Sequence, residues 1–132
     1  MIKDAQQSGF KITYPGKVAM NELVGFYHEA DIFVFASSCE NLPNILLEAM
    51  SSGLPIACSN IEPMPSVLKD GGIYFDPFSS KSIYHSLKEL IGDPLLRETI
   101  ANTAFKESKK YNWQNCSNET LKVLSDVAKK YN

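Results

Sequence analysis

Two glutamates, Glu40 and Glu48, lie in the segment SCENLPNILLEAMSSGLPI, residues 38–56. At neutral pH each is a carboxylate that can accept hydrogen bonds from sugar hydroxyls, and such charge-assisted bonds are stronger than neutral ones. A helix predicted over 43–52 rises about 1.5 Å per residue, so the two acids can contact the two ends of a ligand several rings long. The backbone N–H groups at the start of that helix suit a phosphate or a diphosphate. Together these features suit a nucleotide sugar.

Both acids also have an explanation that involves no ligand. In the helix predicted over 43–52, Glu48 falls on a polar face, and an acid just before a helix, such as Glu40, is favoured by the partial positive charge of the helix N-terminus. The polar face holds Asn44, Glu48, Ser51 and Ser52, and the opposite, apolar face holds Leu46, Leu47, Ala49, Met50 and Leu54. Periodicity alone slightly favours this surface interpretation of Glu48.

The elements around the two acids alternate between strand and helix patterns. We predict strands over 10–16, 32–36, 54–59 and 73–75, helices over 20–30, 43–52 and 66–70, and mostly helix from Ser80, broken at 92–94 and near 111–113. The run at 32–36 is uninterrupted in its apolar character, as expected of a parallel strand covered on both faces. This alternation predicts an α/β fold with a parallel sheet, in which ligands bind where the strands end and the helices begin.

Local signals predict where two of the helices begin and end. Pro43 suits the first position of a helix, because its missing N–H would have had no partner there. Gly53 suits the left-handed position just past a helix end. Asn21 can cap the helix at 20–30, whose apolar face would hold Leu23, Val24, Tyr27 and Ala30.

Composition limits the classes of protein to consider. The chain has 132 residues, 44% of them apolar, which suits one domain with a core of its own. Its longest apolar runs are far shorter than the ~20 residues that cross a bilayer, and its start lacks the apolar core of a signal peptide, so we expect a cytoplasmic protein. The three cysteines, Cys39, Cys58 and Cys116, form neither a disulfide framework nor a CxxC pair. No pattern of metal ligands can be recognised.

Charge is divided unevenly along the chain. The net charge is -2, yet residues 104–132 carry six lysines against three acids. A solvated helix explains these lysines better than an anionic membrane surface does, although peripheral association with the inner face of a membrane stays open. Basic residues with interleaved aromatic ones are too sparse for a nucleic-acid interface.

The segment ADIFVFASSCENLPNILLEAMSSGLPI, residues 30–56, resembles the E-x7-E signature of retaining glycosyltransferases with the GT-B fold, in the large family of glycosyl transferases group 1. The resemblance extends upstream through ITYPGKVAMNELVGFYHEA and downstream through GGIYFDP, IGDPLLRETIANTA and YNWQNCSNET, over essentially the whole chain. It implies a partial Rossmann-like parallel sheet with flanking helices, the latter part of a GT-B C-terminal domain. Residues 1–132 would form a partial nucleotide-sugar-binding domain, with its C-terminal helices from about residue 80.

The resemblance also implies roles for individual residues. Glu40 matches the glutamate at the hydroxyls of the transferred sugar, near the reacting face, and is the candidate catalytic residue. Glu48 matches the glutamate that accepts hydrogen bonds from the ribose hydroxyls. The residues matching the segment beside the sugar, the phosphates and the ribose are Asn41, Leu42, Asn44 and Ile45. Asn41 stands where glycine is commoner in the family.

The loop from Pro15 to Met20 matches a region beside the nucleobase, which makes Gly16 and Lys17 further candidates for donor binding. The resemblance implies a nucleoside-diphosphate sugar as substrate and neither a cofactor nor a metal. It predicts an enzyme that transfers a hexose-type sugar to a glycan or lipid-linked acceptor in the biosynthesis of cell-surface polysaccharide. The alternative is a non-catalytic nucleotide-binding or regulatory α/β module.

Parts of the family's enzymes have no counterpart in this sequence. The N-terminal acceptor domain, the first two strands of the donor domain and the basic residues that neutralise the diphosphate are not matched. We therefore expect a fragment with weak or no activity by itself, which needs the acceptor domain as a partner. The strand predicted at FKITY would have lost its neighbours, so we expect it to pair elsewhere or to be supplied to a second copy, giving a homo-oligomer by strand exchange.

Overall fold

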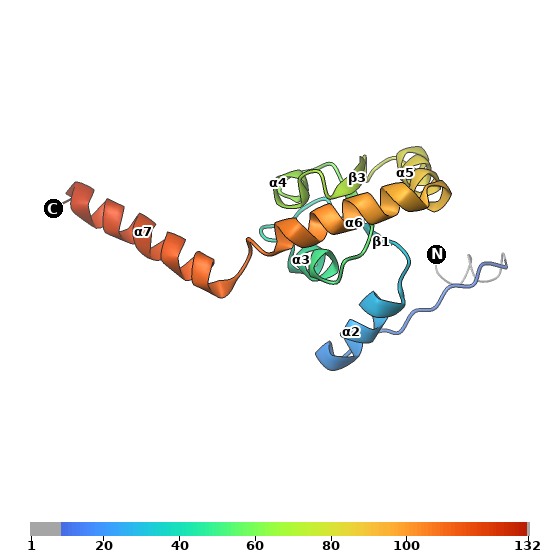
Figure 1. Ribbon diagram of the computed structural model, residues 1–132, viewed down its shortest axis with the longest axis horizontal. Helices are drawn as coiled ribbons and strands as arrows, with labels where there is room; N and C mark the ends of the chain where they lie inside the picture. The colour runs from blue at the N-terminus through green and yellow to red at the C-terminus, as the bar shows by residue number, and fades with distance from the viewer. Residues whose placement is uncertain (1–8, 132) are drawn as a thin grey trace.

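The computed structural model describes residues 9–131 and has a parallel sheet at its centre. The three strands are β1 (Phe33–Phe35), β2 (Ile56–Ser59) and β3 (Gly72–Phe75), in the order β1-β2-β3 (Figure 1). Both neighbouring pairs are parallel, with Ala57 opposite Val34 on one side and Ile73 on the other. The predicted α/β class and the parallel sheet are confirmed.

Six helices connect and flank these strands in the described part of the chain. They are α2 (Met20–Glu29), α3 (Asn44–Ser51), α4 (Met64–Leu68), α5 (Ser80–Gly92), α6 (Pro94–Ser108) and α7 (Trp113–Tyr131). The ends of each helix lie within three residues of a predicted bound or break. Figure 1 shows α6 running across the body of the molecule, between α3 and α5, while α7 projects away from it.

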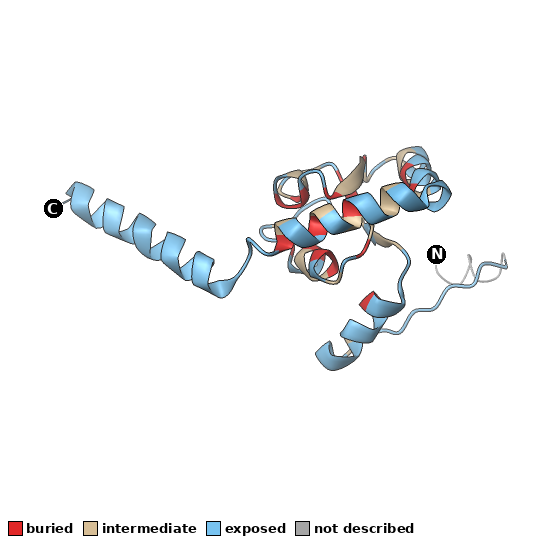
Figure 2. Cartoon of the chain, in the orientation of Figure 1, coloured by how far each residue is buried: buried red, intermediate tan, exposed pale blue. Residues whose placement is uncertain are grey.

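The core lies on both faces of β2, all four residues of which are buried. Side chains alternate along a strand, so Ile56 and Cys58 join a cluster with α3 and α4, whereas Ala57 joins Phe75, Leu90 and Ile100 on the opposite face. Figure 2 shows that the buried segments concentrate around the sheet. Coverage of both faces is what a parallel sheet requires.

Helix α3 is fixed by its buried face and by its C-terminal cap. Leu46, Ala49 and Met50 are completely buried, as predicted for this face. Gly53 has a φ of 72°, its N–H donates to the Met50 carbonyl, and the next N–H donates to the Ala49 carbonyl. This pair of bonds is the Schellman arrangement, which satisfies carbonyls that a helix end leaves open. The predicted role of Gly53 is confirmed.

The turn between α5 and α6 explains the sequence GDPLLR. The Asp93 carboxylate accepts a hydrogen bond from the Leu96 N–H at 2.9 Å and so caps α6, in which Pro94 is the first residue. Arg97 then reaches back, and its Nη1 donates to the carbonyl oxygens of Leu90 at 2.6 Å and Ile91 at 3.1 Å. One short motif therefore ends α5 and begins α6.

The strand predicted over 10–16 is wrong, because the structure places no strand between residues 9 and 19. Phe10 and Tyr14 are 67% and 72% exposed, and Figure 1 shows this segment running away from the sheet. A strand is stable when a neighbour completes its backbone hydrogen bonds. The segment therefore does not join the sheet β1-β2-β3.

Three further expectations about the first half of the chain need correction. Asn21 does not cap α2, since Ala19 holds the N-cap position and Glu22 accepts a hydrogen bond from the Ala19 N–H at 3.4 Å. Strand β1 is not covered on both faces, because Val34 is 42% exposed on one of them; β1 is also the edge strand of the three-stranded sheet. On α2, Leu23 and Tyr27 face the core as predicted, but Val24 and Ala30 are exposed.

Helix α7 has no buried residue and extends from the body of the molecule (Figures 1 and 2). Its exposed large apolar side chains are Trp113, Leu121, Val123, Leu124, Val127 and Tyr131. Neither α7 nor any other helix within residues 9–131 combines the length and apolar character needed to span a membrane.

Burial separates the three cysteines into two classes, and this predicts their reactivity. Cys58 is fully buried on β2, and burial raises the pKa of its thiol to about 12, whereas Cys39 and Cys116 are exposed. The thiolate is the nucleophile, so iodoacetamide near pH 8 should modify the two exposed cysteines in the folded chain and reach Cys58 only in denaturant. Mass spectrometry of the peptides measures this order. Equal modification of all three without denaturant would contradict the burial of Cys58.

Candidate functional site

Both acids lie beyond the carboxyl end of β1, where ligands bind in parallel α/β sheets. Glu40 lies in the loop between β1 and α3, and Glu48 lies within α3. The buried face of α3 and its Schellman end fix the helix, and Pro43, buried at the position before its first residue, fixes the loop. The backbone that carries both carboxylates is therefore held by the core.

Glu48 is half-buried and accepts a hydrogen bond from a residue distant in sequence. The hydroxyl of Tyr27, on α2, donates to Glu48 Oε2 at 2.9 Å. Burial, and next the hydrogen bond and the negative charge of Glu48, raise the pKa of the Tyr27 phenol well above its ordinary value. The surface interpretation of Glu48 is therefore incomplete, because this carboxylate lies against α2 and not on a fully solvated face.

Glu40 has a comparable partner within its own loop. The Ser37 hydroxyl donates to Glu40 Oε1 at 2.7 Å, and both residues are half-buried. Each acid thus has one oxygen engaged by a hydroxyl donor, and the described residues supply no donor for the other oxygen. A carboxylate held in this way can accept hydrogen bonds from the hydroxyls of a ligand.

The two donors, Tyr27 and Ser37, have no site role in the sequence patterns above. A signal was present for Tyr27, since a tyrosine on the apolar face of a predicted helix needs a partner for its hydroxyl. For Ser37 the signal was weaker: a serine three residues before an acid in a loop can reach it. Neither signal identifies the partner by itself.

The predicted residues between the acids are mostly exposed at the start of α3. Leu42 and Ile45 are 51% and 52% exposed, unusual for large apolar side chains next to a core, and Asn41 and Asn44 are exposed as well. The expectation of open N–H groups needs one correction: the Asn44 N–H donates to the Leu42 carbonyl at 2.9 Å. Because Pro43 has no N–H, the amides that remain for an anion begin at Ile45.

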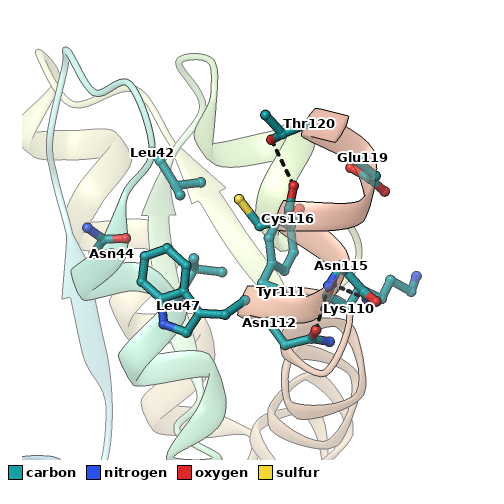
Figure 3. Close-up of a pocket in the computed structure, with 11 residues that line it drawn as sticks. Leu42, Asn44, Leu47, Lys110, Tyr111, Asn112, Asn115, Cys116, Glu119 and Thr120 are labelled. Atoms are coloured by element: carbon teal, nitrogen blue, oxygen red, sulfur yellow. Dashed lines mark hydrogen bonds between the residues drawn. The ribbon is translucent and has the colours of Figure 1, made fainter. Parts of the chain in front are cut away.

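A hollow of about 640 Å³ lies between this segment and the junction of α6 with α7 (Figure 3). Leu42, Asn44 and Leu47 form one wall. The other wall holds Lys110, Tyr111, Asn112, Trp113, Asn115, Cys116, Glu119 and Thr120. The hollow shares two residues with the predicted site, but neither Glu40 nor Glu48 lines it.

Gly16 and Lys17 are exposed in the segment that leads into α2. Gly16 has a φ of 72°, which makes a turn after Pro15. Within residues 9–131 the hydrogen-bond partners of the Glu48 and Glu40 carboxylates are Tyr27 and Ser37, and Gly16 and Lys17 do not line the hollow, so their place beside a nucleobase stays a prediction. The same residues contain no group of three histidine, cysteine or acidic side chains placed to hold a metal ion.

Comparison with known proteins identifies one family over most of the chain. Residues 2–107 match the family described as glycosyl transferases group 1. The chain is 33% identical over 110 residues to the O-antigen chain mannosyltransferase B of Escherichia coli, covering 83% of this chain and 29% of that protein. It is 31% identical over 112 residues to the sulfoquinovosyl transferase SQD2 of Arabidopsis thaliana, covering 81% of this chain and 22% of that protein. The chain thus spans less than a third of these relatives.

Solved structures agree with this assignment. The C-terminal domain of a glycosyl transferase group 1 family protein (LpcC) from Francisella tularensis aligns with a TM-score of 0.70 and 27% identity, covering 83% of this chain and 58% of that one. Sucrose-phosphate synthase from Thermosynechococcus elongatus aligns with a TM-score of 0.82 over 98% of this chain and 34% of its own, at 18% identity, which shows the shared fold. This chain belongs to the family of glycosyl transferases group 1.

Proposed function

We propose that this chain is the donor-binding part of an enzyme that transfers a hexose-type sugar from a nucleoside-diphosphate sugar. The observation that carries the proposal is the pairing of Glu40 with Ser37 and of Glu48 with Tyr27 at the carboxyl end of β1. Two acids with one oxygen engaged and one open are suited to hold two separate groups of sugar hydroxyls.

The two acids have different roles in this proposal. Glu48 accepts hydrogen bonds from the ribose hydroxyls, and Glu40 holds the hydroxyls of the transferred sugar near the reacting face. The exposed segment between them contacts the sugar, the diphosphate and the ribose through Asn41, Leu42, Asn44 and Ile45. Gly16 and Lys17, in the exposed loop before α2, would contact the nucleobase.

The proposed reaction retains the anomeric configuration and requires no metal ion, as the E-x7-E resemblance implies. The relative from E. coli is named for mannose transfer to the O-antigen chain, which supports a glycan or lipid-linked acceptor in cell-surface polysaccharide synthesis. The plant relative is named for a different sugar, sulfoquinovose. The identity of the hexose is therefore not part of the proposal.

The complete reaction needs more than these 132 residues. The chain spans 29% and 22% of the two relatives, and the apolar side chains of α7 have no cover in the described structure. Burial of this apolar surface against an acceptor-binding domain would be favourable. We accordingly propose a cytoplasmic enzyme in which that domain completes the site, and weak or no sugar transfer by the chain alone. Exchange of residues 10–14 between two copies stays a prediction.

Titration of the ¹⁵N-labelled chain with UDP, GDP and ADP tests the proposal. The amide signals of Asn41, Leu42, Asn44 and Ile45 should shift with at least one of the three, together with the signal of Glu48. A nucleotide that bound only through attraction between its diphosphate and lysine side chains would instead shift the signals of α7, where Lys122, Lys129 and Lys130 lie. Shifts confined to α7, or no shift with any of the three ligands, would contradict the proposed function.

A further inference from the structure

Tyr27 connects α2 to the body of the molecule. It is 8% exposed and is the buried residue of α2, seen as the single buried segment on that helix in Figure 2. Its ring centroid lies 6.0 Å from that of Phe33, the first residue of β1, at an interplanar angle of 56°. A tilted aromatic pair at this distance is a favourable packing geometry. The ring is therefore held by α2 and β1 together.

The hydroxyl at the end of this ring reaches a third element. It donates to Glu48 Oε2 on α3 at 2.9 Å, a bond between residues 21 positions apart. A phenol keeps its proton at neutral pH, so this hydroxyl acts as the donor and the Glu48 carboxylate oxygen accepts. Tyrosine has few side-chain torsions, so a packed ring gives its hydroxyl a defined position.

We infer that Tyr27 is a positioning residue, whose hydroxyl orients the Glu48 carboxylate so that its open oxygen faces the ribose of the bound nucleotide. This inference rests on the proposed function. Tyr27 itself contacts neither the reacting atoms nor, by this account, the ligand. It restricts the rotation of a flexible acid before the ligand arrives, which lowers the entropy that binding would otherwise lose.

The substitution Tyr27→Phe removes the hydroxyl and keeps the ring against Phe33. Without its donor the carboxylate can turn and be solvated by water, so the affinity for a nucleoside diphosphate should fall by about tenfold, as for one hydrogen bond to a charged group. The loss should depend on the ribose hydroxyls. Two probes are therefore used. One is whichever of UDP, GDP and ADP binds the chain most tightly, and the other is the 2′,3′-dideoxy analogue of that nucleotide. Isothermal titration calorimetry on the full 132-residue chain measures both affinities.

Tyr74→Phe is the matched control. Tyr74, on β3, also donates its hydroxyl, in this case to the Lys69 carbonyl oxygen, which is remote from the acids in the chain. Removing this hydroxyl should cost a similar amount of stability and leave both affinities unchanged. A second comparison uses Glu48→Gln: in that background Tyr27→Phe should cause little further loss, because the two residues act through one interaction.

The outcomes separate this inference from the proposed function. Weaker binding of the ribonucleotide in Tyr27→Phe, with binding of the dideoxy analogue unchanged, is the expected result. Three results would overturn the role of Tyr27 and leave the proposed function standing. They are an equal loss of affinity for both ligands, no loss of affinity, and a loss from Tyr27→Phe that is as large in the Glu48→Gln background as in the unaltered chain. If the unaltered chain bound no nucleoside diphosphate, or bound the ribonucleotide and its dideoxy analogue equally, the ribose assignment of the proposed function would itself be wrong.

Discussion

Replacement of Glu48 by alanine is expected to weaken the binding of a nucleoside diphosphate by about 100-fold. Hydrogen bonds to a charged group contribute about 1.5–3 kcal/mol each, and the carboxylate is proposed to accept them from the ribose hydroxyls. Glu48→Ala removes that acceptor and leaves the Tyr27 hydroxyl without its partner. Isothermal titration calorimetry with the chain and its tightest diphosphate ligand measures the loss.

Glu89→Ala is the control for this change. Glu89 is exposed on α5, and neither lines the hollow at the α6–α7 junction nor bonds to the loop of Glu40. Glu89→Ala removes one negative charge, as Glu48→Ala does, so a long-range electrostatic effect on affinity would appear in both variants. Loss of a specific hydrogen-bond acceptor would appear in Glu48→Ala alone. Equal affinities of the two variants and the unaltered chain for the nucleoside diphosphate would contradict the ribose assignment.

Gly71→Ala is expected to lower the free energy of unfolding by about 3 kcal/mol, the upper part of the range for overpacked cores. A Cβ at Gly71 would lie 2.8 Å from Ala104 Cα and 2.9 Å from Ala104 N, both backbone atoms of α6. Helix α6 cannot yield as a flexible side chain would, because it packs across α3 and the sheet (Figure 1). The contact forces α6 away from β3.

Urea denaturation followed by circular dichroism measures this loss, and Gly92→Ala supplies the matched control. Gly92 ends α5, and a Cβ there meets no atom within 4 Å. The same added methyl group should therefore change stability by no more than about 0.5 kcal/mol at Gly92. Similar midpoints for the two variants would show that the close packing of α6 on Gly71 is incorrect.

The elements with strong local signals could be predicted from the sequence. Pro43 and Gly53 predict the ends of α3, and the structure places both within a residue of those positions. Asp93 and Pro94 likewise mark the start of α6. These signals succeed because the capping interactions join residues close together in the chain.

The segment 10–16 shows where local signals fail. Its β-branched and aromatic residues favour a strand, but strand formation depends on a neighbour, and residues 9–19 form no strand in the structure. The exposure of Val34 has the same origin, since an apolar run does not reveal which elements pack on each face of its strand. Both errors concern contacts that local sequence does not contain.

The candidate site was predictable in its residues and not in its geometry. Periodicity placed Glu48 on the polar face of α3, and the resemblance gave it a role, but the bond from Tyr27 depends on how α2 packs against β1 and α3. The packing of α2 against β1 and α3 is a tertiary contact, so the spacing of residues along the chain does not predict it. The Asn44 N–H, bonded to the Leu42 carbonyl, likewise shows that a helix start cannot be assumed to be open.

A crystal structure of the chain with its tightest nucleoside diphosphate tests the central claim most directly. We expect both ribose hydroxyls within hydrogen-bonding distance of the Glu48 carboxylate, with the diphosphate at the start of α3 and Tyr27 still bonded to Oε2. A nucleotide bound instead in the hollow beside Tyr111 and Trp113, with Glu48 making no contact to the ribose, would contradict it.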